Sequence, residues 1–156
     1  MAFASLLLVA AWQDVRTMRI ANRLSIAIVA VFAVWAACGL LRGTLPPVDL
    51  GIAVLFAAIV FILGALAFAA GAFGGGDVKL LAAASLFAGP TLLPDLLMVM
   101  AIVGGVMGCA IAFGLRIGPA APVPASGTSV AVRLRGSLPY GPAIAAGGLW
   151  TIFSLI

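Results

Sequence analysis

The sequence of 156 residues has no histidine and no glutamate, and its charged residues are eight Lys or Arg and four Asp. The lack of His excludes Ser-His-Asp triads, Cys-His pairs and His-ligated zinc, and the lack of Glu excludes a pair of catalytic glutamates. The two cysteines, Cys38 and Cys109, lie in apolar runs without metal-type spacing, so we expect them to be buried apolar residues. The polar side chains that remain available for catalysis or binding are four Asp, one Lys, seven Arg and some hydroxyl groups.

What is abundant is apolar sequence: 65% of the residues are hydrophobic, 8% are charged and the mean hydropathy is +1.35. Six charge-free runs are candidates for spans: 1–13, 24–41, 50–76, 80–94, 96–115 and 136–156. The stretch 117–132 is also uncharged, but its three prolines predict a loop. Four of the six runs have the length of about 20 residues that crosses a bilayer. The short first and fourth runs reach it if the first helix continues to about Thr17 and the fourth begins at about Asp77. We therefore predict an all-α integral membrane protein, a polytopic bundle of about six transmembrane helices, with 1–156 as a single membrane-embedded domain.

The positive charges indicate the orientation of this bundle. In a bundle of six helices, the first, third and fifth connections lie on the same side of the membrane. These connections contain Arg16, Arg19, Arg23, Lys79, Arg116, Arg133 and Arg135. Only Arg42 falls on the other side, so the positive-inside rule makes the first side cytoplasmic and turns both termini away from it. The same alternation puts Asp14 and Asp77 on the cytoplasmic side. It puts Asp49 and Asp95, each after a proline, on the opposite side, where we expect them to cap helices.

Asp14 and Asp77 are the candidates for chemistry, because ionisable residues at membrane depth are costly and usually functional. Two carboxyls brought together in a partly apolar site cannot both ionise easily, so one of them keeps its proton. The ionised member can act as general base on a water, while the protonated member polarises a peptide carbonyl. The pair titrates as a unit, so neither role is assigned to either residue.

The segment before the second aspartate is rich in glycine: A-G-A-F-G-G-G-D-V-K, residues 70–79. Three consecutive glycines remove side-chain bulk and let a substrate backbone come close to Asp77. An aspartate in the first turn of a helix also meets the positive end of the helix dipole. A flexible turn with a capping Asp would give the same pattern. Lys79 either extends to the membrane interface or favours ionisation of the nearby carboxyl.

Three blocks of the chain resemble the type IV prepilin leader peptidases, a family of integral-membrane aspartyl proteases. Gly74, Gly76 and Asp77 match the family's G-x-G-D motif. The stretch D-V-R-T-M-R-I-A-N-R-L (14–24) is similar to the first aspartate block, and L-P-Y-G-P-A-I-A-A-G (138–147) to the block of the last helix. The resemblance implies catalytic Asp14 and Asp77, with the site shaped by Gly74, Gly76, Lys79, Asn22, Pro139 and Gly141.

The sequence also departs from the family pattern. Ala21 stands where the family usually has proline, which should loosen the turn into the second helix. Long members carry a methyltransferase region and a four-cysteine zinc module, and we expect neither here, nor any soluble domain. The resemblance is therefore to the short, peptidase-only form associated with Flp or tight-adherence pili.

The resemblance implies a function as well as a site. It implies an aspartic endopeptidase that removes basic leaders from prepilin or pseudopilin precursors, at the cytoplasmic face of the bacterial inner membrane. The partners would be these precursors, the lipid bilayer and pilus-assembly or secretion machinery, with no nucleic acid and no cofactor. The proline-containing loop 118–137, with Arg133 and Arg135, would either shape the site or attract anionic lipid.

Two other classes of function remain open at this stage. A small ion or proton-coupled transporter subunit could use the same aspartate pair, but it would need a polar path to the far side. A non-catalytic assembly component could use the glycine-rich turn as a packing joint. Presenilin-like proteases share G-x-G-D, but the basic first block and the short chain favour the bacterial peptidase.

Overall fold

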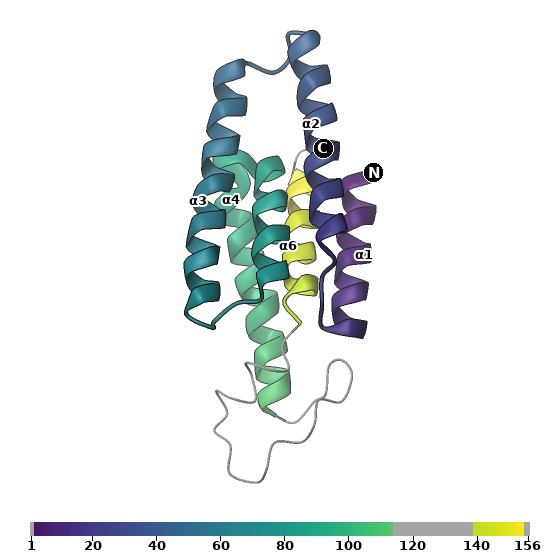
Figure 1. Ribbon diagram of the computed structural model, residues 1–156, viewed down its shortest axis with the longest axis vertical. Coiled ribbons are helices and arrows are strands. Elements are labelled where there is room, and N and C mark those ends of the chain that lie inside the picture. The colour runs from purple at the N-terminus through teal and green to yellow at the C-terminus, as the bar shows by residue number, and fades with distance from the viewer. Residues whose placement is uncertain (1, 114–138, 155–156) are drawn as a thin grey trace.

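The computed structural model describes residues 2–113 and 139–154, and those residues form a bundle of helices (Figure 1). The helices are α1 (Ala2–Thr17), α2 (Asn22–Leu41), α3 (Pro47–Ala69), α4 (Gly75–Ala112) and α6 (Gly141–Ser154). In Figure 1 the connections α1–α2 and α3–α4 lie at the lower end of the bundle, and the connection α2–α3 lies at the upper end. The first helix ends at Thr17, as the sequence predicted.

Three of these helices, α2, α3 and α4, are long and apolar enough to cross a membrane. The prediction of a helical membrane protein is thereby confirmed. The predicted count of about six spans is not supported, because the described residues contain five helices and three candidate spans. At a rise of about 1.5 Å per residue, the 16 residues of α1 and the 14 of α6 are shorter than the hydrocarbon layer of about 30 Å.

The predicted fourth and fifth spans fall within α4, which is broken at Gly89 (φ 56°, ψ −169°). Glycine tolerates this positive φ, and Pro90 suits the first position of the helical half that follows. Figure 1 shows the second half of α4 turning back beside the first. The sequence had placed this turn at Pro94, so the prediction that Asp95 caps a helix is wrong: it lies within α4. Asp49 lies in the first turn of α3 but is not its N-cap residue.

Helix α6 packs mainly against α4 and α1, and glycines allow the close approach. A Cβ atom at Gly147 would lie 2.5 Å from the carbonyl oxygen of Leu96, and one at Gly148 would lie 2.6 Å from Cδ1 of Leu7. Small residues at such contacts are typical of helices that associate in lipid, where close packing replaces the hydrophobic effect. This packing fixes the position of α6 and therefore of its first residue, Gly141, next to α1.

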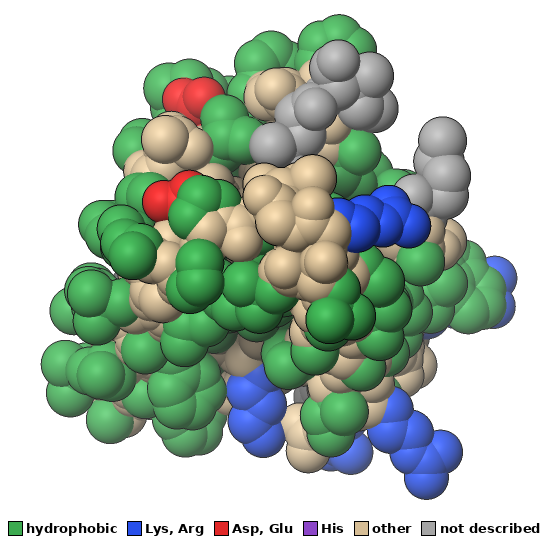
Figure 2. Space-filling view, turned by 90° about the horizontal axis from the view of Figure 1, so that it is seen from above, with side chains coloured by type: hydrophobic (Ala, Val, Ile, Leu, Met, Phe, Trp, Pro, Cys, Tyr) green, Lys and Arg blue, Asp and Glu red, His purple; other side chains and the backbone are tan. Residues whose placement is uncertain are grey.

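The outer surface of the bundle is strongly apolar. Figure 2, seen from the end that carries the α2–α3 connection, shows hydrophobic side chains over most of that view. Cys38 and Cys109 are both free and exposed, so the prediction that they are buried is wrong. An apolar neighbourhood in the sequence does not imply burial in this protein, because lipid solvates apolar side chains on the outside of the bundle.

A stability prediction follows from Ala21, which precedes α2 with φ −67° and ψ 132°. Proline fixes φ near −65°, so Ala21→Pro should fit this backbone without strain. We expect the substitution to stabilise the folded protein by about 0.4–1 kcal/mol through the lower entropy of the unfolded chain. Unfolding midpoints in detergent would measure it, with Ala27→Pro, in the interior of α2, as a destabilised control. A lower midpoint for Ala21→Pro would contradict the prediction.

Candidate active site

The two predicted catalytic aspartates both lie at the lower end of the bundle, in the orientation of Figure 1. Asp14 lies in the last turn of α1 and Asp77 in the first turn of α4. Both side chains are buried, with exposed fractions of 4% and 8%. They are near enough for the charge of Asp14 to act on Asp77. The structure therefore brings into one buried site two carboxyls that are 63 positions apart in the sequence.

Each carboxyl lies next to the start of a helix. The N–H of Gly141, the first residue of α6, donates to Oδ2 of Asp14 over 2.7 Å. Asp77 lies in the first turn of α4, and its Oδ2 lies close to Gly74, the N-cap residue of that helix. The first N–H groups of a helix lack partners within the helix and carry its positive dipole end. Both helix starts can therefore stabilise negative charge on the pair, in a site from which water is largely excluded.

The glycines of the site are required by packing. A Cβ at Gly141 would lie 2.6 Å from Cβ of Asp14, and one at Gly74 would lie 2.5 Å from Oδ2 of Asp77. At Gly76 the nearest atom would be Cβ of Ile20, 3.1 Å away, in the connection between α1 and α2. The sequence suggested that the glycines leave room for a substrate. The structure shows that Gly74 and Gly141 leave room for the aspartates themselves.

Lys79 and Asn22, which the sequence placed among the residues that shape the site, form a hydrogen bond with each other on the other side of α4 from Asp77. Nζ of Lys79 donates a hydrogen bond to Oδ1 of Asn22 over 3.0 Å, which joins α4 to the start of α2. Two residues along a helix correspond to about 200° of rotation, so Lys79 and Asp77 face opposite sides of α4. Lys79 therefore positions α2 against α4, a role that neither sequence-based alternative included.

An aromatic pair that the sequence analysis did not single out connects two of the glycine-containing segments. Phe73 stacks on Tyr140 with ring centroids 4.7 Å apart, so the residue before Gly74 contacts the residue before Gly141. Pro139, predicted to shape the site, is fully buried next to this pair. The only sequence signal for the contact is the position of each aromatic residue directly before a glycine of the site.

Positive charge accompanies the site, as the sequence predicted for this end of the bundle. Arg16, Arg19 and Arg23 lie in and around the α1–α2 connection, on the same end as Lys79. Arg116, Arg133, Arg135 and the loop 118–137 lie outside the described residues. Within the described ranges, no group of three or more His, Cys, Asp or Glu side chains is placed to hold a metal ion.

A helical membrane protein with two carboxyls in one buried site, one in the first turn of α4 and one bonded to the first residue of α6, has the architecture of a membrane-embedded aspartic peptidase. Residues 1–109 match the Type IV leader peptidase family, and the chain belongs to this family. The resemblance noted in the sequence is thereby confirmed. No curated protein and no solved structure gave a match.

The family match covers two of the three blocks that the sequence analysis identified. It includes Asp14 and Asp77 but ends before Pro139 and Gly141. The structure alone links the third block to the aspartates, because the N–H of Gly141 is hydrogen-bonded to Asp14. Membership in the family implies peptidase chemistry on prepilin precursors.

Proposed function

We propose that this protein removes the basic leader peptide from Flp-type prepilin or pseudopilin precursors at the cytoplasmic face of the bacterial inner membrane. The observation that carries the proposal is the buried pair of Asp14 and Asp77 in a helical membrane protein of the leader peptidase family. Pilus-assembly or secretion machinery would receive the product.

In this mechanism the two aspartates share one proton. The ionised carboxyl takes a proton from a water molecule, whose oxygen attacks the carbonyl carbon of the scissile peptide bond. The protonated carboxyl polarises the carbonyl oxygen and then gives its proton to the leaving nitrogen as the C–N bond breaks. The N–H group of Gly141 holds the Asp14 carboxyl in place during these transfers. The two roles belong to the pair and are not assigned to either residue.

The orientation of the protein supports cleavage at the cytoplasmic face. Arg16, Arg19, Arg23 and Lys79 lie at the end of the bundle that contains the aspartates, and Arg42 follows α2 at the other end. Positively charged segments of membrane proteins stay in the cytoplasm. A substrate with a basic leader and an apolar helix obeys the same rule, so its leader–helix junction would lie at the depth of Asp14 and Asp77.

Co-expression tests this function directly. A panel of Flp-type prepilins is expressed in a host without its own prepilin peptidase, together with either the wild-type protein or Asp77→Ala. We expect a gel shift that reports leader removal with the wild type and unprocessed precursor with Asp77→Ala. Wild-type protein that is inserted in the membrane but leaves every precursor intact would overturn the proposal.

The buried polar groups do not support the alternative function as a transporter subunit, which needs a polar path across the membrane. Besides the two aspartates, the buried polar side chains of the described residues are Ser25, Ser85 and Thr151. The hydroxyls of Ser85 and Thr151 donate to carbonyl oxygens of their own helices, Leu81 at 2.8 Å and Gly147 at 3.1 Å. They are thus occupied within their helices, and they offer a poor path for an ion or proton from the aspartates to the far side.

A further inference from the structure

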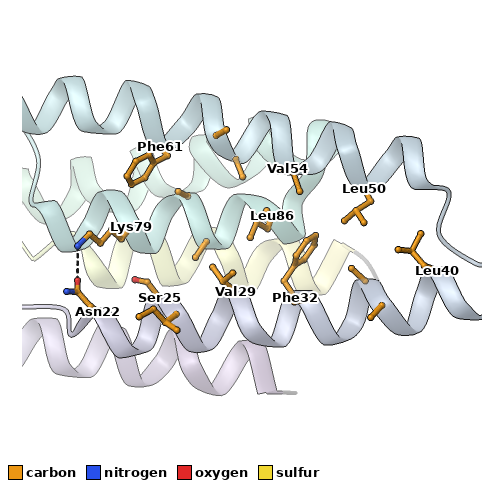
Figure 3. A pocket seen from close by; sticks show the side chains of 18 residues that line it. Asn22, Ser25, Val29, Phe32, Leu40, Leu50, Val54, Phe61, Lys79 and Leu86 are labelled. Atoms are coloured by element: carbon orange, nitrogen blue, oxygen red, sulfur yellow. Dashed lines mark hydrogen bonds between the residues drawn. The ribbon is translucent and has the colours of Figure 1, made fainter.

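A groove of about 950 Å³ lies between α2 and α3, with the first half of α4 as its floor (Figure 3). Both α2 and α3 pack extensively against α4 and much less against each other, which leaves much of the space between them open. Figure 3 shows Asn22 and Lys79 at one end of the groove and Leu40 at the other. The groove belongs to the other side of α4 from Asp77, so the aspartate pair does not account for it.

The length of the groove matches a membrane-crossing helix. Its lining on α2 extends from Asn22 to Leu40, and at 1.5 Å per residue this stretch is about 27 Å long. The hydrocarbon layer is about 30 Å thick. A lipid acyl chain belongs to one leaflet and reaches only about half of that thickness. A transmembrane helix therefore fits the groove better than a lipid does.

The walls also suit a helix. Alanines line the groove on every side, among them Ala33 and Ala36 of α2, Ala57 and Ala58 of α3, and Ala83 of α4. Small residues let another helix approach closely, which is the main source of association between helices in lipid. Apart from the end with Asn22, Ser25 and Lys79, the lining is apolar.

One buried polar atom in the groove lacks a partner. Ser25 has an exposed fraction of 6%, and its Oγ is the buried side-chain polar atom without a hydrogen-bond partner in the described part of the chain. In Figure 3 this oxygen is directed toward the end at which Asn22 and Lys79 lie. A buried hydroxyl without a partner is costly. The first N–H groups of a helix have no partner of their own, and they would provide one once rotation about χ1 of Ser25 turned the enclosed hydroxyl into the groove.

We propose that the groove binds the apolar transmembrane helix of the substrate, with the N-terminal end of that helix at Ser25. This inference rests on the proposed function, because it takes the substrate to be a basic leader followed by an apolar helix. From Ser25 the chain would pass over the glycines at 74–76 to reach Asp77. The path is about one helix diameter, 10 Å, which about three extended residues cover.

Disulfide cross-linking tests the proposal. In a Cys38→Ser/Cys109→Ser background, a single cysteine is placed either at Ala33, which lines the groove, or at Val34, which does not line it and is 65% exposed. The two neighbours have nearly the same depth in the membrane. The probe is a Flp-type prepilin precursor with one cysteine in the middle of its apolar helix. We expect at least about tenfold more adduct with Ala33→Cys than with Val34→Cys on non-reducing gels.

The same samples report leader removal, so the two proposals can fail separately. Leader removal with equal amounts of adduct at both positions, or with no adduct, would overturn the proposal that the groove binds the substrate helix. The proposed peptidase function would then still stand. Adduct at Ala33→Cys without leader removal would support the groove and overturn the peptidase function. A disulfide-linked homodimer at Ala33→Cys without pilin adduct would make a second copy of this chain the occupant and overturn the inference.

Ser25 provides a second test as a positioning residue. We expect Ser25→Ala to raise KM for the whole precursor by about fivefold with kcat nearly unchanged, as for the loss of one hydrogen bond that binds substrate and transition state equally. Ser25→Thr keeps the hydroxyl and should restore KM. A fall in kcat at constant KM, or the same KM for Ser25→Ala and wild type, would contradict the role.

Discussion

Asp77→Asn and Asp14→Asn are each expected to lower the rate of leader removal by at least about a hundredfold. Asparagine has nearly the shape of aspartate, so the buried packing should persist while the pair loses the shared proton and one of its acid–base groups. The rate would be measured with purified enzyme in detergent and a prepilin precursor, by the decrease of the precursor band with time. Membrane insertion should be that of the wild type.

The other two aspartates provide matched controls for this experiment. Asp49 is exposed in the first turn of α3, and Asp95 lies within α4 beyond the break at Gly89. Asp49→Asn and Asp95→Asn should therefore cleave the precursor at rates close to that of the wild type. Substantial cleavage by Asp14→Asn would show that Asp14 and Asp77 do not act as a pair.

Gly141→Ala is expected to lower the cleavage rate by about a hundredfold without removing a catalytic group. The new methyl group would lie 2.6 Å from Cβ and 2.8 Å from Oδ2 of Asp14, so either α6 or the aspartate must move. A displacement of about 1 Å at a reacting group is enough for a loss of this size. Overpacking of this kind also costs about 1–3 kcal/mol of stability, which unfolding midpoints in detergent would report.

Gly105→Ala is the control for that substitution. Gly105 lies in α4, and a Cβ there would meet no atom within 4 Å. Its replacement should leave cleavage unchanged and stabilise the helix slightly, because glycine is less favourable than alanine inside a helix by about 0.5–1 kcal/mol. If Gly141→Ala kept the wild-type rate, α6 would not be the element that holds Asp14 in position.

The sequence predicted the features that depend on the cost of placing charged residues within the lipid bilayer. The alternation of apolar runs placed Asp14 and Asp77 at one end of the bundle. The end of α1 at Thr17 was also predicted, although the reason given for it, a spanning length, does not hold for a helix of 16 residues. The placement of the aspartates succeeds because a charged residue and a long apolar run have few acceptable positions in a bilayer.

Other features depend on contacts that no local pattern encodes. The hydrogen bond between Gly141 and Asp14 joins residues 127 positions apart. The break in α4 occurs at Gly89, whereas the sequence had placed the turn at Pro94. Only the backbone conformation shows which position is used. Exposure of Cys38 and Cys109 also escaped prediction, because apolar residues face lipid as readily as they face the core of the bundle.

The bond between Asp14 and Gly141 also has a consequence for synthesis of the enzyme. The N–H group that holds Asp14 is made 127 residues after Asp14 itself. At about 5–20 residues per second, the ribosome needs about 6–25 s to make the intervening chain. Throughout this interval the nascent protein contains Asp14 without its partner. Proteolytic activity should therefore begin only when α6 has entered the bundle, so that a chain still being translated cannot yet cut its neighbours.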